Sequence, residues 1–198
     1  MEIRVCSYRG PTAISPADIV VDTTSRSLEW GPGLSPFFLG PVNLYEGMTA
    51  CNVENAWQYS KVYPEHVNER GLPTEEWFKW AAKGYTKKRA DRYPMGRGKV
   101  PLYSYWGVFR YGYIDARKKI YAPLYSEAVA KTPQFLLLKQ LKDSKKDGII
   151  WLMDFDGYDH KFEGLTYEQV INNPARKMGH AFVLAMMLDN ERVWETVP

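Results

Sequence analysis

Runs of hydrophobic residues predict several short strands, and the clearest of them covers residues 149–155. Every residue from 149 to 153 is apolar, and Asp154 is the only charged residue in the stretch. A continuous apolar run of this length is typical of a strand that is buried on both faces, so we expect it at the centre of a sheet. Shorter runs predict strands at 3–8 and 18–23, and the aromatic stretch 101–114 is expected to be extended.

Helical spacing and helix-end signals predict the other elements. A first helix is expected within residues 51–63, with Asn52 as its N-cap and Pro64 as its end. The remaining helix starts are marked by a capping residue or a proline: Thr74, Asp115, Thr132 with Pro133, Thr166 with Gln169, and Asn173 with Pro174. Pro123 is expected to break or kink the helix that Asp115 begins. The last helix, which reaches Leu188, is apolar over most of its surface and is expected to be buried.

Residues 25–41 are predicted to form an ordered loop packed against the domain. The segment is rich in glycine and proline, and its apolar cluster from Leu34 to Leu39 is too short and too interrupted for a helix. Ordered loops on a rigid scaffold often carry functional residues. With a length of 198 residues, these elements predict a single α+β domain over residues 1–198, with a small sheet flanked by helices.

The helix within 51–63 has two distinct faces. Val53, Ala56 and Trp57 fall on one side, together with Ser60, and are expected to pack against the core. The other side is polar, and it aligns three residues at helical spacing: Glu54, Gln58 and Lys61. An ordinary surface helix with a solvated outer face has the same pattern. Spacing alone therefore leaves open whether the polar face lines a pocket or meets solvent.

Cysteine and histidine usage argues against a metal centre or a disulfide framework. Cys6 and Cys51 form no CxxC pair, and the chain has only three histidines. We therefore expect no metal and no cofactor. The sequence has no apolar run long enough to span a membrane and no apolar core of a signal peptide near its first residue, so a cytoplasmic protein without a membrane partner is expected. The sequence does not indicate an oligomeric state.

Basic residues are concentrated between 83 and 99, although the net charge of the chain is only +3. Asp91 is the single acid among seven cations: Lys83, Lys87, Lys88, Arg89, Arg92, Arg97 and Lys99. Such a stretch suits the phosphates of a nucleotide or a nucleic acid, but a solvated helix end gives the same composition. Aromatic residues make up 15% of the chain, and those in 101–114, including Trp106, are candidates for lining a pocket that holds a sugar or a nucleobase.

Two sources of carboxylates are the best candidates for catalysis. Glu54 lies on the polar face of the 51–63 helix, and Asp154, Asp156 and Asp159 lie at or just past the end of the 149–155 strand. Paired carboxyl groups can assist a leaving group or stabilise an oxocarbenium-like centre during cleavage of a glycosidic bond. A plain Asp-Gly turn explains the aspartates equally well. Nucleophilic catalysis is disfavoured because neither cysteine has a histidine near it in sequence and no GxSxG motif is present.

The segment from 34 to 61 resembles the NADAR family. The resemblance rests on Leu34-Ser35-Pro36-Phe37, Glu46-Gly47, and residues 52–58 (NVENAWQ) followed by Lys61. Pro36 stands where the family has Asn, and Asn55 stands where it has His. Weaker similarity extends over most of residues 26–187, where the strand end at 149–159 lacks the family's Trp-Gly. The resemblance implies a NADAR-like fold and N-glycosidase activity on ADP-ribose-type or phosphoribosyl substrates, including removal of ADP-ribose from modified guanine in DNA.

By this resemblance, Glu54 is the catalytic carboxylate. The position of Asp154 and Asp156 at the strand end makes one of them the expected second acidic group. Motif residues expected to contact the substrate are Ser35, Phe37, Asn55, Gln58 and Lys61. Charge alone adds candidate phosphate contacts at Arg26, Lys119, Lys87, Lys88, Arg89, Arg97 and Lys99. The expected substrate is nucleotide-like, including ADP-ribosylated or base-modified DNA in the manner of a DNA glycosylase. The alternative is a non-catalytic module that binds ADP-ribose or nucleic acid.

Overall fold

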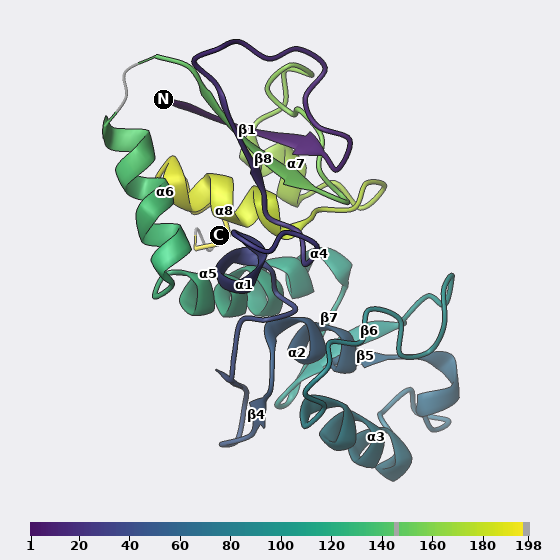
Figure 1. Cartoon of the computed structure of the whole chain (residues 1–198). Helices are drawn as coiled ribbons and strands as arrows, with labels where there is room; N and C mark the ends of the chain where they lie inside the picture. The colour runs from purple at the N-terminus through teal and green to yellow at the C-terminus, as the bar shows by residue number, and fades with distance from the viewer. Residues whose placement is uncertain (145–146, 196–198) are drawn as a thin grey trace.

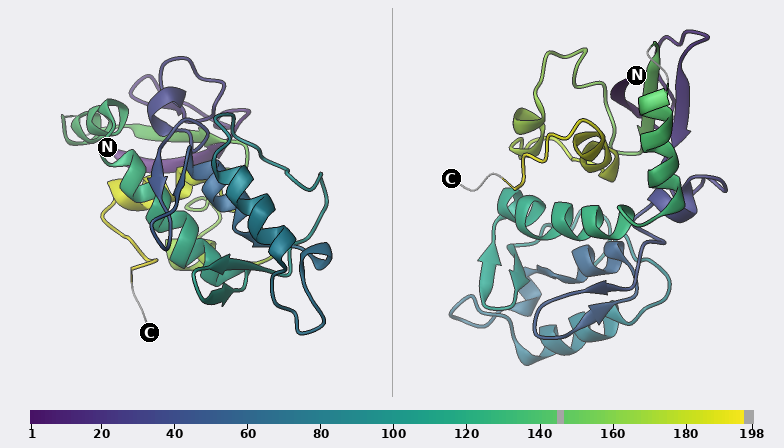
Figure 2. Two further views of the ribbon diagram at one scale, coloured as in Figure 1. Left: turned by 90° about the horizontal axis from the view of Figure 1, so that it is seen from below. Right: turned by 90° about the vertical axis from the view of Figure 1, so that its left-hand side faces the viewer.

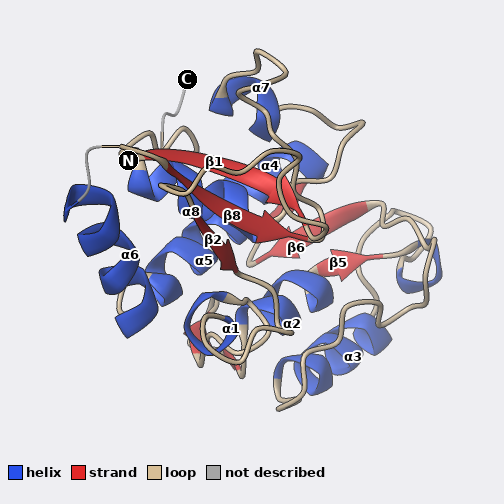
Figure 3. Cartoon of the chain, turned by 45° about the horizontal axis from the view of Figure 1, so that its top comes forward, coloured by secondary structure: helices blue, strands red, loops and turns tan. Residues whose placement is uncertain are grey.

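The computed structural model describes residues 1–144 and 147–195 and has a mixed α+β architecture (Figure 1). Its largest layer of strands is a parallel sheet of order β1-β8-β2, made of β1 (Glu2–Ser7), β8 (Ile149–Asp154) and β2 (Ile19–Asp22). The three arrowheads point the same way in Figure 3. β8 lies in the middle with Ile150 and Leu152 fully buried, so its predicted central position is confirmed.

Helices cover this sheet and connect it to the rest of the molecule. α8 (His180–Leu188) packs on β1 and β8, and α5 (Ala122–Val129) packs on α8. All nine residues of α8 are buried, as its apolar composition predicts. The helix begins at His180, however, and not at the predicted Asn173-Pro174, because the backbone of Gly179 is extended and caps it there. The capping box of Thr166 and Gln169 is present at α7 (Tyr167–Ile171), as predicted.

A second group of elements lies on the other side of α5 (Figures 1 and 2). It contains α2 (Val53–Tyr59), α3 (Glu75–Tyr85), the short 3-10 helix η1 (Pro64–His66) and an antiparallel sheet of order β5-β6-β7. The strands are β5 (Lys61–Val62), β6 (Tyr103–Trp106) and β7 (Phe109–Tyr111), which confirms extended structure within 101–114. A small hairpin joins β3 (Val42–Asn43) to β4 (Thr49–Ala50). The whole is one compact domain.

The helix predicted to start at Asp115 and to break or kink at Pro123 starts earlier and continues past the proline. α4 (Tyr113–Ala116) continues through a π-helical turn, η2 (Arg117–Tyr121), into α5. The N–H of Ala122 bonds to the carbonyl of Arg117, five residues back. This wider turn moves the preceding carbonyls away from the proline ring, so Pro123 sits in the first turn of α5 without breaking it. The predicted helix from Thr132-Pro133 is α6 (Pro133–Ser144).

Residues 25–41 form an ordered segment, but the prediction that they contain no helix is wrong. Gly31–Leu34 make one helical turn, α1, whose glycines allow close approach of other backbone and side chains. A Cβ on Gly31 would lie 2.7 Å from the carbonyl oxygen of Thr24. Tyr125 on α5 donates its hydroxyl to the carbonyl of Leu34 at 2.7 Å, which anchors the end of this turn in the core.

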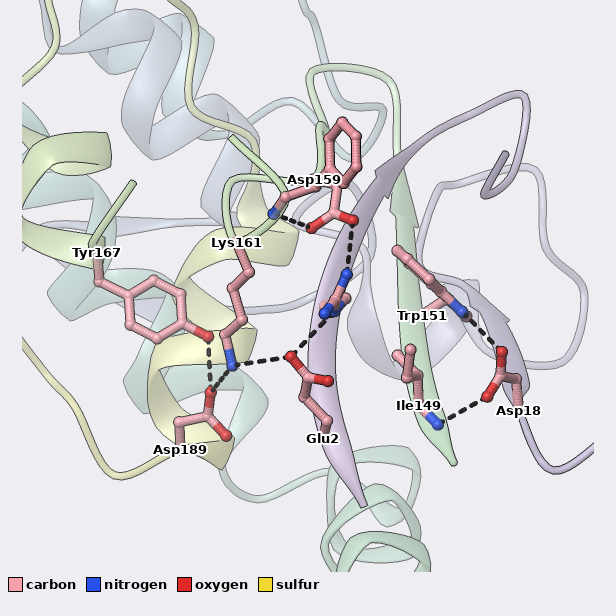
Figure 4. A network of polar contacts seen from close by, with 10 residues as sticks. Glu2, Asp18, Ile149, Trp151, Asp159, Lys161, Tyr167 and Asp189 are labelled. Carbon is pink, nitrogen blue, oxygen red and sulfur yellow. Dashed lines mark hydrogen bonds and ion pairs between the residues drawn. The ribbon is translucent and has the colours of Figure 1, made fainter. Parts of the chain in front are cut away.

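Polar contacts on the outer side of the parallel sheet join segments from both ends of the chain (Figure 4). Lys161 contacts Asp189 at 3.2 Å and Glu2 at 4.0 Å, and the Tyr167 hydroxyl donates to Asp189 at 2.8 Å. Asp18 accepts the backbone N–H of Ile149 at 2.9 Å, which fixes the start of β8. The contacts of Lys161 and Tyr167 join the start of α7 and the end of α8 to β1. Each helix in residues 1–144 and 147–195 is too short or too polar to cross a bilayer.

Candidate active site

A cavity of about 520 Å³ opens where the C-terminal end of β8 meets the start of α8, one face of α2 and the loop 92–101. Charged side chains of both signs and several aromatic rings line it. The lining contains Thr24, Ser25, Arg26, Ser35, Pro36, Phe37, Glu54, Trp57, Gln58, Lys61, Tyr63, Arg92, Tyr93, Gly96, Gly98, Lys99, Val100, Pro101, Tyr113, Arg117, Tyr121, Asp154, Phe155, Asp156, Lys177, Met178, Gly179 and His180. The volume is typical of a site for a nucleotide-sized ligand.

α2 is buried on nearly every side, so the interpretation of its polar face as a solvated surface is wrong. Six of its seven residues are buried, and Trp57 is partly buried. Its N-terminus is closed by the preceding loop, because the N–H of Glu54 bonds to the carbonyl of Pro36 at 3.0 Å. Asn52 caps the helix as predicted, accepting the N–H of Asn55 at 2.8 Å. These bonds place the loop that contains Ser35 and Phe37 beside Glu54.

Glu54, Gln58 and Lys61 form a hydrogen-bonded chain along the cavity wall. Gln58 Nε2 donates to Glu54 Oε1 at 2.9 Å, and Lys61 Nζ donates to Gln58 Oε1 at 2.7 Å. Lys61 Nζ also lies 4.7 Å from the centroid of the Trp57 ring. Only Glu54 and Gln58 meet through helical spacing, because α2 ends at Tyr59, before the predicted Pro64, and Lys61 begins β5. The amide of Gln58 fixes the orientation of both charged neighbours.

The protonation of this chain is shifted by burial. Burial raises the pKa of Glu54 above its usual 4.5, against the opposing effects of the Gln58 hydrogen bond and the Lys61 charge. Burial also lowers the pKa of Lys61 to about 8, although the charge of Glu54 opposes that change. A carboxyl and an ammonium group with pKa values moved toward neutrality are typical of groups that exchange protons in catalysis.

Asp154 and His180 form a buried ion pair that also lines the cavity. His180 Nδ1 lies 3.1 Å from Asp154 Oδ2, and His180 Nε2 lies 2.9 Å from the carbonyl oxygen of Thr23. Both ring nitrogens therefore face acceptors, which favours the doubly protonated imidazolium. Burial alone would raise the pKa of Asp154, but His180 and the N–H of Ala181 hold it at about 2. A Cβ on Gly179 would lie 2.1 Å from Asp154 Oδ2, so this glycine makes room for the carboxylate.

Asp156 is less buried than Asp154 and binds a cation from the basic stretch. Arg92 Nη2 donates to Asp156 Oδ2 at 3.0 Å, and the two side chains are 34% and 29% exposed. Asp156 therefore keeps access to solvent and to the cavity, whereas both oxygens of Asp154 have hydrogen-bond donors within the fold. Glu54, Asp154 and Asp156 thus line the same cavity, although they come from distant parts of the sequence.

Asn55 is turned away from the cavity. The sequence predicts a substrate contact for it, whereas in the structure its amide holds the basic stretch in place. Its Nδ2 donates to the carbonyls of Lys87 and Arg89 at 2.8 and 3.2 Å, and its Oδ1 accepts the N–H of Asp91 at 2.9 Å. These three bonds occupy the amide and position Arg92, which follows directly in the chain.

We therefore expect Asn55→Ala to destabilise the fold by about 1 to 3 kcal/mol, because it removes the three hydrogen bonds by which the buried Asn55 amide holds residues 87–91. Urea denaturation measures the free energy of unfolding, and limited proteolysis reports cleavage within 87–91. Asn172→Ala is the matched control, since the Asn172 amide makes its hydrogen bonds on the surface to Glu168 and its effect is expected below about 0.5 kcal/mol. Equal stability of the two variants would contradict the assigned role.

The other predicted residues divide between the cavity and the surface. Arg26, Ser35, Phe37 and Lys99 line the cavity, although Lys99 also forms a surface ion pair with Glu65 at 2.8 Å. The remaining candidates lie outside the lining: Lys87, Lys88, Arg89, Arg97, Trp106 and Lys119. Lys87 is held by Tyr59 and Asp91 at 2.6 and 2.9 Å, and Trp106 packs edge-on against Tyr45 with ring centroids 5.1 Å apart.

Sequence reasoning missed several residues that line the cavity, chiefly His180, Lys177, Tyr121 and Phe155. His180 stands at the start of an apolar helix, and a single polar residue at a helix start, directly after a glycine, was the one available signal. Lys177 lies in the stretch that the sequence assigns to a helix and the structure does not. In residues 1–144 and 147–195, no three His, Cys, Asp or Glu side chains gather as a metal site.

The fold and the cavity define a single-domain α+β protein with an acidic pair and basic side chains around one site. The chain belongs to DUF6939, a family of unknown function, whose model matches residues 11–183. No curated protein and no solved structure matches the chain. The resemblance to the NADAR family remains a prediction from residues 34–61.

Proposed function

We propose that the protein is an N-glycosidase that hydrolyses the bond between a ribose or deoxyribose and a base, or an ADP-ribose adduct. The observation that supports this most directly is a pair of carboxyl groups in one cavity with opposite pKa shifts. The pKa of buried Glu54 is raised, and that of Asp154 is held at about 2. The different environments leave Asp154 ionised and bound to His180, and Glu54 as the carboxyl group whose protonation can change during a reaction.

In the proposed reaction, the bond between C1′ and the leaving nitrogen breaks, and water supplies a hydroxyl to C1′ and a proton to the leaving nitrogen. Ionised Glu54 stabilises the oxocarbenium-like sugar and accepts the proton of the attacking water, which then passes to the leaving nitrogen and returns Glu54 to its ionised form. Its raised pKa makes it a stronger base than an exposed glutamate. Gln58 orients the carboxylate. Lys61, whose pKa is about 8, supplies the compensating positive charge.

Of the two candidate aspartates, Asp156 is better placed to meet substrate. Asp154 is a positioning residue in this proposal, because its carboxylate binds His180 and caps α8 through the N–H of Ala181. Asp156 is partly exposed and forms an ion pair with Arg92. A substrate phosphate can replace Asp156 as the partner of Arg92, and a substrate hydroxyl can replace Arg92 as the partner of Asp156.

The charge of the cavity supports a nucleotide-like substrate. Its Lys and Arg residues are Arg26, Lys61, Arg92, Lys99, Arg117 and Lys177, and its carboxylates are Glu54, Asp154 and Asp156. Arg117 is committed to the fold, since it is buried and donates to the carbonyls of Ile171 and Asn173. The excess of cations over acids favours an anionic ligand such as a phosphate or diphosphate.

The proposal is tested by incubating the wild-type protein with free nucleotides, ADP-ribose derivatives, and ADP-ribosylated and base-modified oligonucleotides. Mass spectrometry is expected to detect a released base or released ADP-ribose from at least one of these substrates. The alternative, a non-catalytic module that binds ADP-ribose or nucleic acid, is favoured by the exposed cations outside the cavity. Binding of a ligand without any product after a long incubation would support that module and overturn the N-glycosidase.

A further inference from the structure

Arginine and aromatic side chains alternate from the cavity toward the surface. At the inner end, the Arg26 and Arg92 guanidinium groups lie 4.9 and 5.5 Å from the centroid of the Phe155 ring. Tyr8 packs against the same ring, with centroids 5.4 Å apart. Phe155 is thus in contact with two cations and a second aromatic ring.

The series continues through the basic stretch. The Arg92 guanidinium also lies 5.5 Å from the Tyr93 ring centroid, and the Arg97 guanidinium lies 5.5 Å from the same centroid. Tyr8 and Tyr93 are 46% and 38% exposed, so their rings are accessible from solvent. We call these six residues the arginine–aromatic ladder: Tyr8, Arg26, Phe155, Arg92, Tyr93 and Arg97.

The ladder starts where a parallel sheet commonly binds its ligand. Tyr8 directly follows β1 and Phe155 directly follows β8, at the C-terminal edge of the sheet. Ligands of α/β proteins bind preferentially at this edge. Phe155, Arg92 and Tyr93 line the cavity, whereas Arg97 lies outside its lining. The ladder therefore connects the candidate active site with the protein surface.

The cations of the ladder are largely unneutralised. Arg92 is paired with Asp156, but Arg26 and Arg97 form no ion pair with a carboxylate in the described parts of the chain. Exposed aromatic rings offer stacking surfaces to bases, and guanidinium groups bind phosphates and stack on bases as well. From Arg26 through Phe155, Arg92 and Tyr93 to Arg97, the two chemistries alternate as bases and phosphates alternate along a nucleic acid strand, and Tyr8 adds a second ring beside Phe155.

We propose that the arginine–aromatic ladder binds single-stranded nucleic acid next to the cavity. A free nucleotide is accommodated by the cavity alone and makes no use of Arg97 outside it. A duplex keeps its bases paired and stacked on one another, so their faces are not available to Tyr8 or Tyr93. Binding of the strand to the ladder does not depend on catalysis. The further step, in which one nucleotide of the strand enters the cavity as the target, rests on the proposed N-glycosidase function.

Fluorescence anisotropy with labelled thymidine and uridine oligonucleotides of about 12 nucleotides tests the proposal. Both strands lack a cleavable adduct, so binding is measured without turnover. We expect both to bind more tightly than a duplex of the same length, and an excess of AMP or ADP-ribose to displace them poorly. Preference for one of the two strands would distinguish DNA from RNA as the natural partner.

Single substitutions identify the ladder as the binding surface. Tyr93→Leu is expected to weaken strand binding about 5- to 100-fold, since it removes one stacking ring. Tyr93→Phe keeps the ring and is expected to retain wild-type affinity. Phe162→Leu is the control at an exposed aromatic residue outside the ladder, where the side chain is 84% exposed, and is expected to change nothing.

The salt dependence of binding tests the phosphate contacts. Arg97→Gln is expected to reduce the slope of log affinity against log salt concentration by about 0.7, the value for one phosphate contact of a single strand. Wild-type affinity and slope in both Tyr93→Leu and Arg97→Gln would overturn the proposal, as would complete displacement of the strand by AMP.

The two proposals fail in different ways. Turnover of a free nucleotide without strand binding would refute the ladder and leave the N-glycosidase intact. Strand binding that depends on Tyr93 and Arg97, without turnover of any substrate, would support the ladder and refute the N-glycosidase.

Discussion

Replacing Glu54 with glutamine is expected to lower turnover about a hundred- to ten-thousandfold while the fold stays intact. The two side chains have the same shape, and the glutamine oxygen can still accept the hydrogen bond from Gln58 Nε2 that Glu54 Oε1 accepts now. The variant removes the carboxylate that we propose stabilises the sugar cation and accepts a proton from water. Initial rates on a substrate that the wild-type protein cleaves give the effect on kcat and KM separately.

The pH profile of the wild-type protein provides a second measurement on the same residue. Activity is expected to rise as Glu54 loses its proton, with a pKa above the ordinary 4.5, and to fall as Lys61 loses its proton near pH 8. The profile of kcat/KM should therefore be bell-shaped. In Glu54→Gln, the acidic limb should disappear from the remaining activity, because the group that titrates there is gone.

Glu127→Gln is the matched control for this prediction. Glu127 lies on α5, outside the cavity, with its side chain 69% exposed and 3.7 Å from Lys131. The same change of charge should leave kcat, KM and the pH profile at wild-type values. Wild-type turnover by Glu54→Gln, or an acidic limb that persists in it, would contradict the catalytic role of Glu54.

The parts of the fold that follow from local signals could be predicted from the sequence. The unbroken apolar run of β8 requires burial on both faces and therefore a central strand. The caps at Asn52 and Thr166 are short-range hydrogen bonds between residues three positions apart. The start of α8 could not be predicted in this way, because it depends on how Asp154 from a distant strand fits against Gly179.

The candidate site likewise has some contacts that local sequence signals predict and others that depend on the tertiary structure. Glu54 and Gln58 are aligned by the geometry of α2, so their spacing predicts their contact, whereas Lys61 reaches Gln58 from the start of β5. The role of the Asn55 amide in holding residues 87–91 could not be predicted, because those residues come from a separate loop. The pairings of Asp154 with His180 and of Asp156 with Arg92 depend equally on tertiary structure. Sequence spacing predicts which side chains share a helix face, and packing decides what lies opposite them.

Replacing Asp154 with asparagine is expected to destabilise the protein by about 3 to 5 kcal/mol, the usual cost of removing one partner from a buried ion pair. The amide cannot neutralise the His180 imidazolium, whose other nitrogen faces the carbonyl of Thr23. Urea denaturation measures the loss. Asp156→Asn is the control in the same turn, and it is expected to cost less than about 1 kcal/mol because Asp156 and Arg92 are both partly exposed.

The difference in unfolding free energy between the wild-type protein and Asp154→Asn should also depend on pH. The folded pKa of Asp154, about 2, lies below its usual 3.8, so its contribution is present above pH 3.8 and is lost as the pH falls toward 2. Burial opposes the charge on His180, but Asp154 raises the His180 pKa above its usual 6.5. The His180 contribution is therefore complete below pH 6.5 and is lost as the pH rises through the folded value. The difference should be largest between about pH 4 and 6.5, and a difference that is constant from pH 3 to 9 would contradict an imidazolium–carboxylate pair.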